Sequence, residues 1–181
     1  MGYSRTRTVV TASLVAALIA VSAFVSVPIG AVPITLQLMA VVLAALVLRP
    51  SGAFAATAIY LLLGAIGLPV FAGGKAGLAV LVGPTGGFLI GFVLGATLGA
   101  WVRRPVAARF GALAGDIAAS ACVLLSAYAV GMPQLAFVTG MSAAAAFAVG
   151  VLPFVVWDAL KAAAAIGFAA SIRKAGAIPE L

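Results

Sequence analysis

The sequence contains no histidine, only one cysteine and only three acidic residues. Catalytic Ser–His or Cys–His sets need an imidazole, and metal sites need clustered histidine, cysteine or carboxylate ligands. The single cysteine, Cys122, has no partner for an intramolecular disulfide and is expected to be a small core residue. These absences argue against a metal centre and against the common hydrolase chemistries, and no cofactor is expected.

Charged residues are scarce throughout, and apolar residues take their place. The 181 residues are 66% hydrophobic and 7% charged, with a mean hydropathy of +1.34. A soluble domain of this size could not keep so apolar a surface in water. We therefore predict an all-α integral membrane protein, formed by residues 1–181 as a single domain in a lipid bilayer. The net charge of +7 is typical of membrane orientation signals and does not indicate a nucleic-acid partner.

Six apolar stretches are long enough, or nearly long enough, to cross the membrane as helices. They are Thr8–Val27, Ile34–Leu48, Ala53–Leu68, Phe88–Val102, Ala112–Val130 and Val151–Ala170. This pattern predicts a six-transmembrane-helix bundle, with a turn at residues 131–134 and a half-helix at residues 135–150. The first stretch, after its basic start, also fits a secretory signal peptide, but the further spans disfavour that interpretation.

Basic residues are unevenly divided between the two sides of this predicted bundle. Eight lie on the side of the termini: Arg5, Arg7, Arg49, Arg103, Arg104, Arg109, Arg173 and Lys174. The other side carries only Lys75. Because basic loops stay on the cytoplasmic side, both termini are predicted to be cytoplasmic. The loops at Val27–Pro33 and Pro69–Gly87 then face outward.

The loop Pro69–Gly87, between the third and fourth predicted helices, is long and rich in glycine. It lacks the G-x-x-x-x-G-K-[ST] pattern of a phosphate-binding loop. It is either an ordinary connector or a segment that folds back over the helices as a lid or re-entrant loop. Apolar residues such as Phe71 and Val80 favour the second interpretation, because a solvated connector would not carry them.

Asp158 and Lys161 lie inside the last apolar stretch and share one helix face, since they are three positions apart. An ionised residue at the bilayer centre costs roughly 2.5–3.5 kcal/mol on insertion scales. The two residues form either an internal salt bridge or the wall of a polar cavity, and intramembrane charges favour the functional interpretation. A membrane enzyme with Asp158 as a base is an alternative, disfavoured by the missing histidine and the few acids.

Other polar residues are expected in supporting roles. Thr35 and Gln37 open the second span, where they can face a cavity, although Thr35 alone fits interfacial capping equally well. Tyr60 lies within the third span. Asp116, near the basic end of the fifth span, is expected to pair with a nearby arginine.

Two stripes of small residues repeat every four positions and offer flat faces for close helix packing. They consist of Ala12, Ala16 and Ala20 in the first span, and of Gly91, Gly95 and Gly99 in the fourth. The alanine stripe is a weak signal because the whole chain is rich in alanine.

Three segments together resemble a known family. VPITLQLMAVVLAALVL (Val32–Leu48), GLPVFAGGKAGLAVLVGPTGGFLIGF (Gly67–Phe92) and the Asp158/Lys161 pair are similar to BioY, the biotin-specific substrate-binding (S) subunit of energy-coupling-factor (ECF) vitamin transporters. The similarity extends over roughly residues 8–174. One difference is that the family has Pro-Gly directly before the aspartate, where this chain has Val-Trp.

The resemblance implies a function in transport and not an enzyme. It implies a six-helix bundle in the cytoplasmic membrane of a bacterium or archaeon, which binds biotin from outside. The implied partners are a transmembrane coupling subunit and two cytoplasmic ATPase subunits. The stripe of Ala12, Ala16 and Ala20 is expected to dock the coupling subunit. An S subunit for another vitamin, or a structural assembly protein, are the alternatives.

Biotin has a ring with two N–H donors and a carbonyl, an apolar sulfur ring and a carboxylate tail. Asp158 can accept the ring N–H groups, and Lys161 can meet either the tail carboxylate or the ring carbonyl. The apolar parts are expected to be covered by Phe71, Tyr60 and Trp157, with the glycine-rich loop closing over the ligand. The remaining predicted site residues are Thr35, Gln37, Gly83, Pro84 and Thr85.

Overall fold

The computed structural model describes residues 2–28 and 30–176, and these residues are almost entirely helical. In chain order the elements are α1 (Gly2–Phe24), β1 (Ser26–Val27), β2 (Ile34–Thr35), α2 (Gln37–Val47), α3 (Pro50–Ala65), a 3-10 helix η1 (Ala72–Gly74), α4 (Leu78–Val82), α5 (Gly86–Phe110), α6 (Ala112–Thr139), α7 (Ala143–Gly150) and α8 (Leu152–Lys174). The strands β1 and β2 pair antiparallel, with Ser26 opposite Thr35. The prediction of an all-α protein is confirmed.

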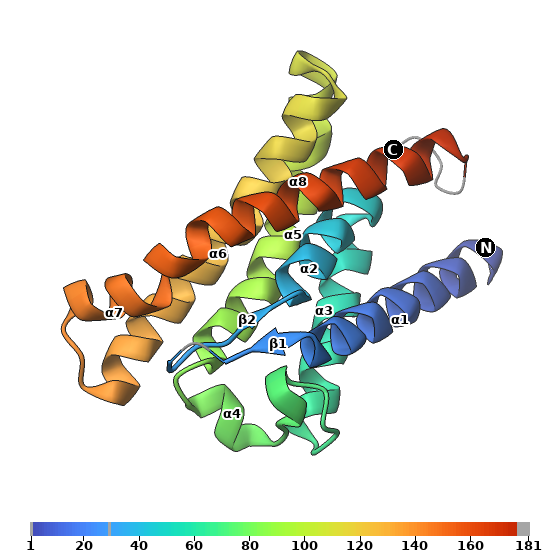
Figure 1. Ribbon diagram of the computed structural model, residues 1–181. Coiled ribbons are helices and arrows are strands. Elements are labelled where there is room, and N and C mark those ends of the chain that lie inside the picture. Colours follow the sequence, from blue (N-terminus) through green and yellow to red (C-terminus); the bar gives the residue numbers. More distant parts are fainter. Residues whose placement is uncertain (1, 29, 177–181) are drawn as a thin grey trace.

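The helices are arranged around α2, which is buried along most of its length. It contacts α5 and α6 on one side and α8 on another, while α1 and α3 pack against each other and against the same centre. Figure 1 shows α8 crossing the long α5–α6 pair, with the β1–β2 hairpin, η1 and α4 gathered at one end. The start of α1 and the end of α8 lie toward the opposite end (Figure 1).

The longest contact is between α5 and α6, which run antiparallel along the glycine stripe. A Cβ atom added at Gly91, Gly95 or Gly99 would lie 2.6–2.7 Å from backbone atoms of α6. Small residues let helix backbones approach this closely. The prediction that these glycines form a close-packing face is therefore confirmed.

This packing gives a matched pair of glycine variants. Gly95→Ala would place its Cβ 2.7 Å from the Cα of Val123, and we expect overpacking to destabilise the fold by about 1–3 kcal/mol. Gly167→Ala in α8 meets nothing within 4 Å, so it should be neutral or slightly stabilising. Thermal unfolding of both variants in detergent measures the difference. Equal melting temperatures would contradict the close packing of α5 on α6.

Two helices, α5 and α6, extend well beyond the ends that the sequence predicted. The fourth predicted span ended at Val102, but α5 continues through Pro105 to Phe110. The predicted turn at residues 131–134 is wrong, because α6 continues through Pro133 to Thr139 and ends at Gly140, which has the left-handed conformation. Apolar helices in membranes tolerate proline because neighbouring groups satisfy the freed backbone atoms.

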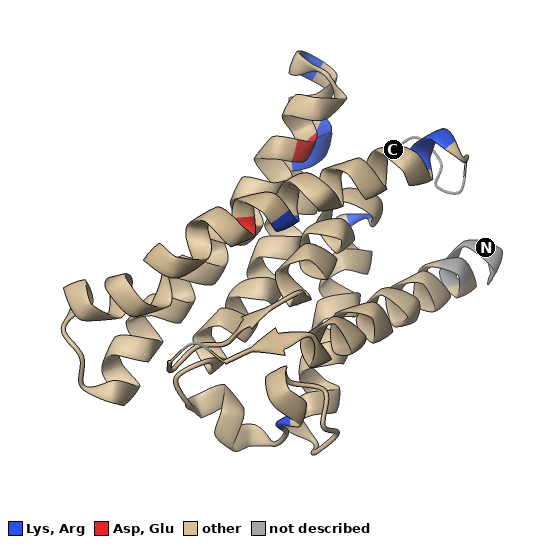
Figure 2. Ribbon diagram, in the orientation of Figure 1, with Lys and Arg blue, Asp and Glu red and all other residues tan. Residues whose placement is uncertain are grey.

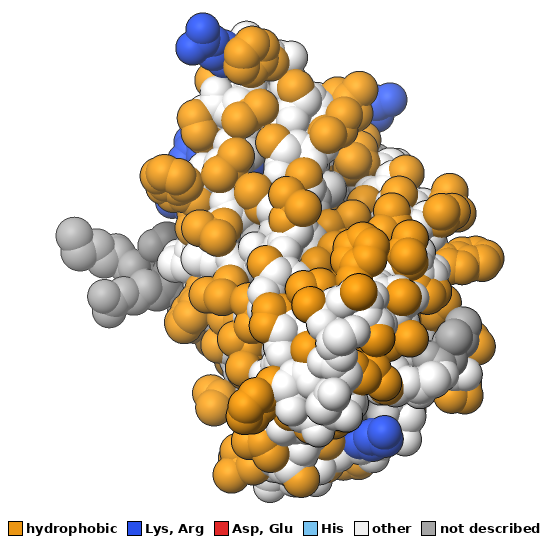
Figure 3. Space-filling view, turned by 90° about the vertical axis from the view of Figure 1, so that its left-hand side faces the viewer, with side chains coloured by type: hydrophobic (Ala, Val, Ile, Leu, Met, Phe, Trp, Pro, Cys, Tyr) orange, Lys and Arg blue, Asp and Glu red, His pale blue; other side chains and the backbone are white. Residues whose placement is uncertain are grey.

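The outer surface is strongly apolar. Three helices within the described residues, α5, α6 and α8, are long and apolar enough to cross a membrane, and the helical stretches in α1, α2 and α3 are shorter but also apolar. Large hydrophobic side chains are exposed along them, for example Leu14, Leu125 and Phe137. Figure 3 shows hydrophobic side chains spread over the face in view. Such a surface suits lipid and not water.

The alanine stripe of α1 faces the protein interior. Ala12 is 1% exposed and Ala16 is 2% exposed, and Ala20 is partly buried against the same core. Since α1 packs on α3 and α2, the small side chains serve contacts within the chain. In this arrangement Ala12 and Ala16 are covered by the chain itself, and docking of a coupling subunit on this stripe stays a prediction.

A buried ion cluster joins three helices at the end away from the hairpin. Asp116 of α6 accepts from Arg103 Nε of α5 at 2.8 Å and from an Arg173 guanidinium nitrogen of α8 at 2.5 Å. The expectation of an arginine partner for Asp116 is confirmed, with two arginines and more burial than an interfacial pair would have. Figure 2 shows the basic residues gathered mainly near the α5–α6 junction and the end of α8.

Candidate functional site

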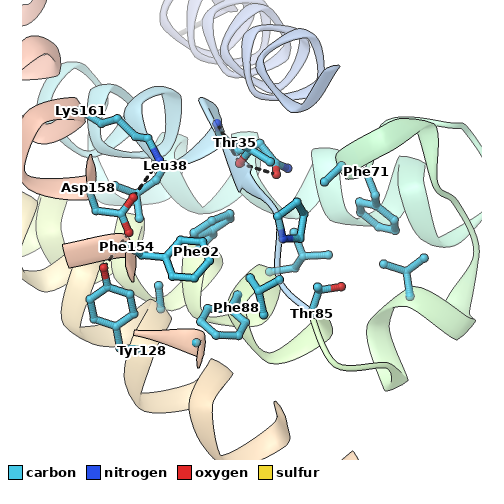
Figure 4. Close-up of a pocket in the computed structure, with 18 of the residues that line it drawn as sticks. Thr35, Leu38, Phe71, Thr85, Phe88, Phe92, Tyr128, Phe154, Asp158 and Lys161 are labelled. Atoms are coloured by element: carbon cyan, nitrogen blue, oxygen red, sulfur yellow. Dashed lines mark hydrogen bonds and ion pairs between the residues drawn. The ribbon is translucent and has the colours of Figure 1, made fainter. Parts of the chain in front are cut away.

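A cavity lies at the end of the bundle that carries the hairpin and α4. It encloses about 720 Å³ between its lining atoms, including the part that opens to the surroundings. Its wall comes from β2, α2, the η1–α4 segment, α5, α6 and α8. Most of the lining is apolar or aromatic, with Leu38, Phe71, Val80, Phe88, Phe92 and Phe154 among the residues (Figure 4).

The inner wall carries a hydrogen-bonded charge pair on α8. Lys161 Nζ donates to Asp158 Oδ1 at 2.9 Å, and the two residues are only 9% and 4% exposed. Tyr128 of α6 donates its hydroxyl to Asp158 Oδ2 at 2.6 Å. Figure 4 shows Tyr128 and Lys161 both directed at the Asp158 carboxylate. The three side chains form a cluster with no net charge that lines the cavity.

Tyr128 is the functional residue that the sequence did not reveal. It lies 30 positions before Asp158, and its only signal was a hydroxyl within an apolar stretch. The continuous helices α6 and α8 bring the two side chains together, because each side chain projects from a fixed helix face. The cluster is therefore a product of helix packing.

A second polar group lies on the wall formed by β2 and the start of α2. Thr35 Oγ1 donates to Gln37 Oε1 at 3.0 Å, and the Gln37 amide donates to the hydroxyl of Tyr60. Thr35 and Gln37 line the cavity, whereas Tyr60 does not. Tyr60 was predicted to contact a ligand. It lies instead behind Gln37 and orients the amide of that residue.

The glycine-rich loop folds over the cavity as η1 and α4. Phe71 is buried and packs edge-to-face on Tyr60, with ring centroids 5.7 Å apart. Val80 and Leu81 pack against the main core. Phe71, Lys75 and Val80 line the cavity. The segment thus forms one wall of the cavity, and its role as a lid stays a prediction.

One side chain of α6 holds the end of α4 and the start of the GPTG segment (residues 83–86). Gln134 Nε2 donates to the carbonyl oxygens of Leu81 at 2.7 Å and Gly83 at 2.9 Å. Thr85 lines the cavity, whereas Gly83 and Pro84 do not. Gly83 therefore contributes by its backbone position.

Trp157 does not reach the cavity. It is 55% exposed on α8 and absent from the lining, although Asp158 is its neighbour. Successive helix positions are turned by about 100°, so a residue next to an inward-facing one points elsewhere. Trp157 is therefore not in the wall where we expected it, and the aromatic residues of the wall include Phe88, Phe92 and Phe154.

The model of the BioY family matches residues 1–177. The chain belongs to the BioY family. Its resemblance to that family, inferred from three short segments, is confirmed over almost the whole length.

Relatives and a solved structure agree with this assignment. The chain is 42% identical over 168 residues to the biotin transporter BioY of Thermotoga maritima, covering 93% of this chain and 96% of the relative. It is 44% identical over 154 residues to the probable biotin transporter BioY of Pyrococcus horikoshii, covering 85% and 88%. The fold matches a crystal structure of the S-component for biotin from an ECF-type ABC transporter with a TM-score of 0.87 and 25% identity, covering 96% of this chain and 94% of the other. Together with the apolar helices, these relatives make the chain a multi-pass membrane protein.

Proposed function

We propose that this protein is the S-component of an ECF-type transporter, and that it binds biotin in the cavity between β2, α4 and α8 for uptake across the cytoplasmic membrane. The observation that carries the proposal is the neutral Tyr128–Asp158–Lys161 cluster at the inner end of an aromatic cavity. The BioY family membership of the chain supports biotin as the ligand.

The cluster has hydrogen-bonding capacity left for a urea-type ring. Asp158 accepts one bond on each oxygen within the protein, and each carboxylate oxygen has a further lone pair. Two ring N–H groups can therefore bind to it. Lys161 has three N–H donors and uses one on Asp158, so it can donate to the ring carbonyl. Apolar walls suit the sulfur ring and the alkyl chain.

The proposed topology has six membrane crossings, by α1, α2, α3, α5, α6 and α8, with both termini in the cytoplasm. The concentration of basic residues at the end opposite the cavity supports this orientation. The side chains of Arg5 and Arg7 lie outside the part that the structure describes. Because α2 has 11 residues, which is about 16 Å of helix, it covers only about half of a hydrocarbon core about 30 Å thick, and the extended residues of β2 lengthen this proposed crossing.

The proposed partners are a transmembrane coupling subunit and two cytoplasmic ATPase subunits. The sequence has no phosphate-binding loop motif with which to use ATP itself. The match to an S-component of an ECF-type transporter supports an assembly of this kind. As a member of the BioY family, this protein is a transporter component and not an enzyme.

Calorimetry on the purified chain tests this function directly. We expect saturable biotin binding in detergent without any ATPase subunit, because every wall of the cavity belongs to this one chain. Thiamine and riboflavin serve as controls, since each is a vitamin without an alkyl carboxylate and without a ring carbonyl flanked by two N–H groups. Absence of biotin binding at micromolar concentrations, or tighter binding of another vitamin, would contradict the proposal.

A further inference from the structure

Two lysines line the cavity, and they differ in burial and in ion pairing. Lys161 is buried and paired with Asp158 at 2.9 Å. Lys75 also lines the cavity but is exposed, and it takes part in none of the ion pairs found among the described residues. Since Asp158 and Lys161 balance each other, Lys75 leaves the cavity with one uncompensated positive charge.

The backbone of Lys75 is fixed at the cavity. Its carbonyl accepts a hydrogen bond from the N–H of Phe71 at 3.0 Å, and the ring of Phe71 is buried beneath the segment. Gly73 and Gly74 have φ values of 70° and 73°, which allow the tight turn between Phe71 and Lys75. The N–H of Gly77 donates to the carbonyl of Gly64 at 2.7 Å, which ties the following residues to α3. Lys75 therefore extends from an anchored turn.

We propose that Lys75 binds the carboxylate of the ligand, so that the ligand enters ring first and lies with its ring at the Asp158–Lys161 pair. This inference rests on the proposed function, because it orients biotin within the same cavity. Lys75, in the glycine-rich loop, would then recognise the carboxylate of the ligand.

Charge balance favours this orientation over its reverse. A ligand carboxylate placed at the inner end would lie beside Asp158, where two buried carboxylates would share Lys161. Like charges at close range in a water-poor site are unfavourable. At the outer end the carboxylate meets the uncompensated Lys75, and its remaining lone pairs can stay hydrated. Asp158 then remains available to the ring N–H groups.

The test compares biotin with biotinamide, in which a neutral amide replaces the carboxylate. Lys75→Gln is expected to weaken biotin binding about tenfold, because the lost contact should be stronger than an exposed ion pair and weaker than a buried charged hydrogen bond. Biotinamide binding should be unchanged, because biotinamide has no carboxylate for Lys75 to bind. Lys75→Arg should retain most of the affinity. Added salt should weaken biotin binding to the wild-type protein more than to Lys75→Gln.

The matched control is Lys174→Gln, which removes the same charge from an exposed position at the far end of α8. It should bind both ligands as the wild type does. If Lys75→Gln weakens both ligands equally, or neither, the inference is wrong while the proposed function stands. If the wild-type protein binds neither ligand, the proposed function is wrong and the inference fails with it.

Discussion

Asp158→Asn is expected to weaken biotin binding roughly ten- to a hundredfold, the range for a lost hydrogen bond to a charged group. An asparagine amide has one acceptor oxygen, so it cannot accept both ring N–H groups and also the Tyr128 hydroxyl. In the protein, Asp158 already receives Tyr128 at 2.6 Å and Lys161 at 2.9 Å. Calorimetry on the purified variant measures the loss.

The single variant also leaves Lys161 buried without its counter-ion, which destabilises the fold by itself. The double variant Asp158→Asn with Lys161→Met removes both charges and separates the two effects. We expect it to regain thermal stability but not biotin affinity. A stable double variant with wild-type affinity would mean that the pair is only structural. Tyr128→Phe is the matched smaller change, since it removes one hydrogen bond and no charge.

The part of the site that the sequence predicted is the part that depends on local geometry. Asp158 and Lys161 are one helical turn apart in a continuous helix, so their contact follows from spacing alone. Tyr128 contacts the same carboxylate from another helix. Its role depends on how α6 lies against α8, and no local pattern in the sequence encodes that arrangement.

The contact partner of the alanine stripe could not be predicted from the sequence for a related reason. A four-residue repeat of small side chains indicates close helix contact, but it does not say whether the neighbouring helix belongs to the same chain. In α1 the contact is internal, because Ala12 and Ala16 are buried against α2 and α3. Trp157 shows that the sequence alone also does not give the direction of a side chain, because the packing of α8 decides which face of this helix lies toward the cavity.

Helix ends were predicted least accurately where proline and glycine occur together. The GMPQ segment has the composition of a turn, yet it continues α6. Its glycine, Gly131, packs directly on the ring of Phe88 in α5, and its glutamine, Gln134, donates to backbone carbonyls of α4 and of the residue after it. Both contacts hold the segment in a helical conformation, and both depend on residues more than 40 positions away.

Asp116→Asn is expected to destabilise the folded protein by about 3–5 kcal/mol, the usual cost of breaking a buried ion pair. Asp116 is 1% exposed and is the only acidic partner of Arg103 and Arg173 among the ion pairs of the described residues. Its neutralisation leaves two arginines without a counter-ion, and Arg103 is itself buried. Thermal unfolding in detergent should detect the change as a large drop in melting temperature.

Biotin affinity distinguishes this structural role from a role in the site. The ion cluster joins α5, α6 and α8 at the end away from the cavity, so Asp116→Asn should bind biotin normally at temperatures where it remains folded. Arg103→Met and Arg104→Met provide a matched pair, because the two arginines are adjacent and only Arg103 is buried and paired. We expect Arg103→Met to lower the melting temperature and Arg104→Met to leave it nearly unchanged. Equal effects of these two variants would show that net charge, and not the buried cluster, determines stability at this end of the bundle.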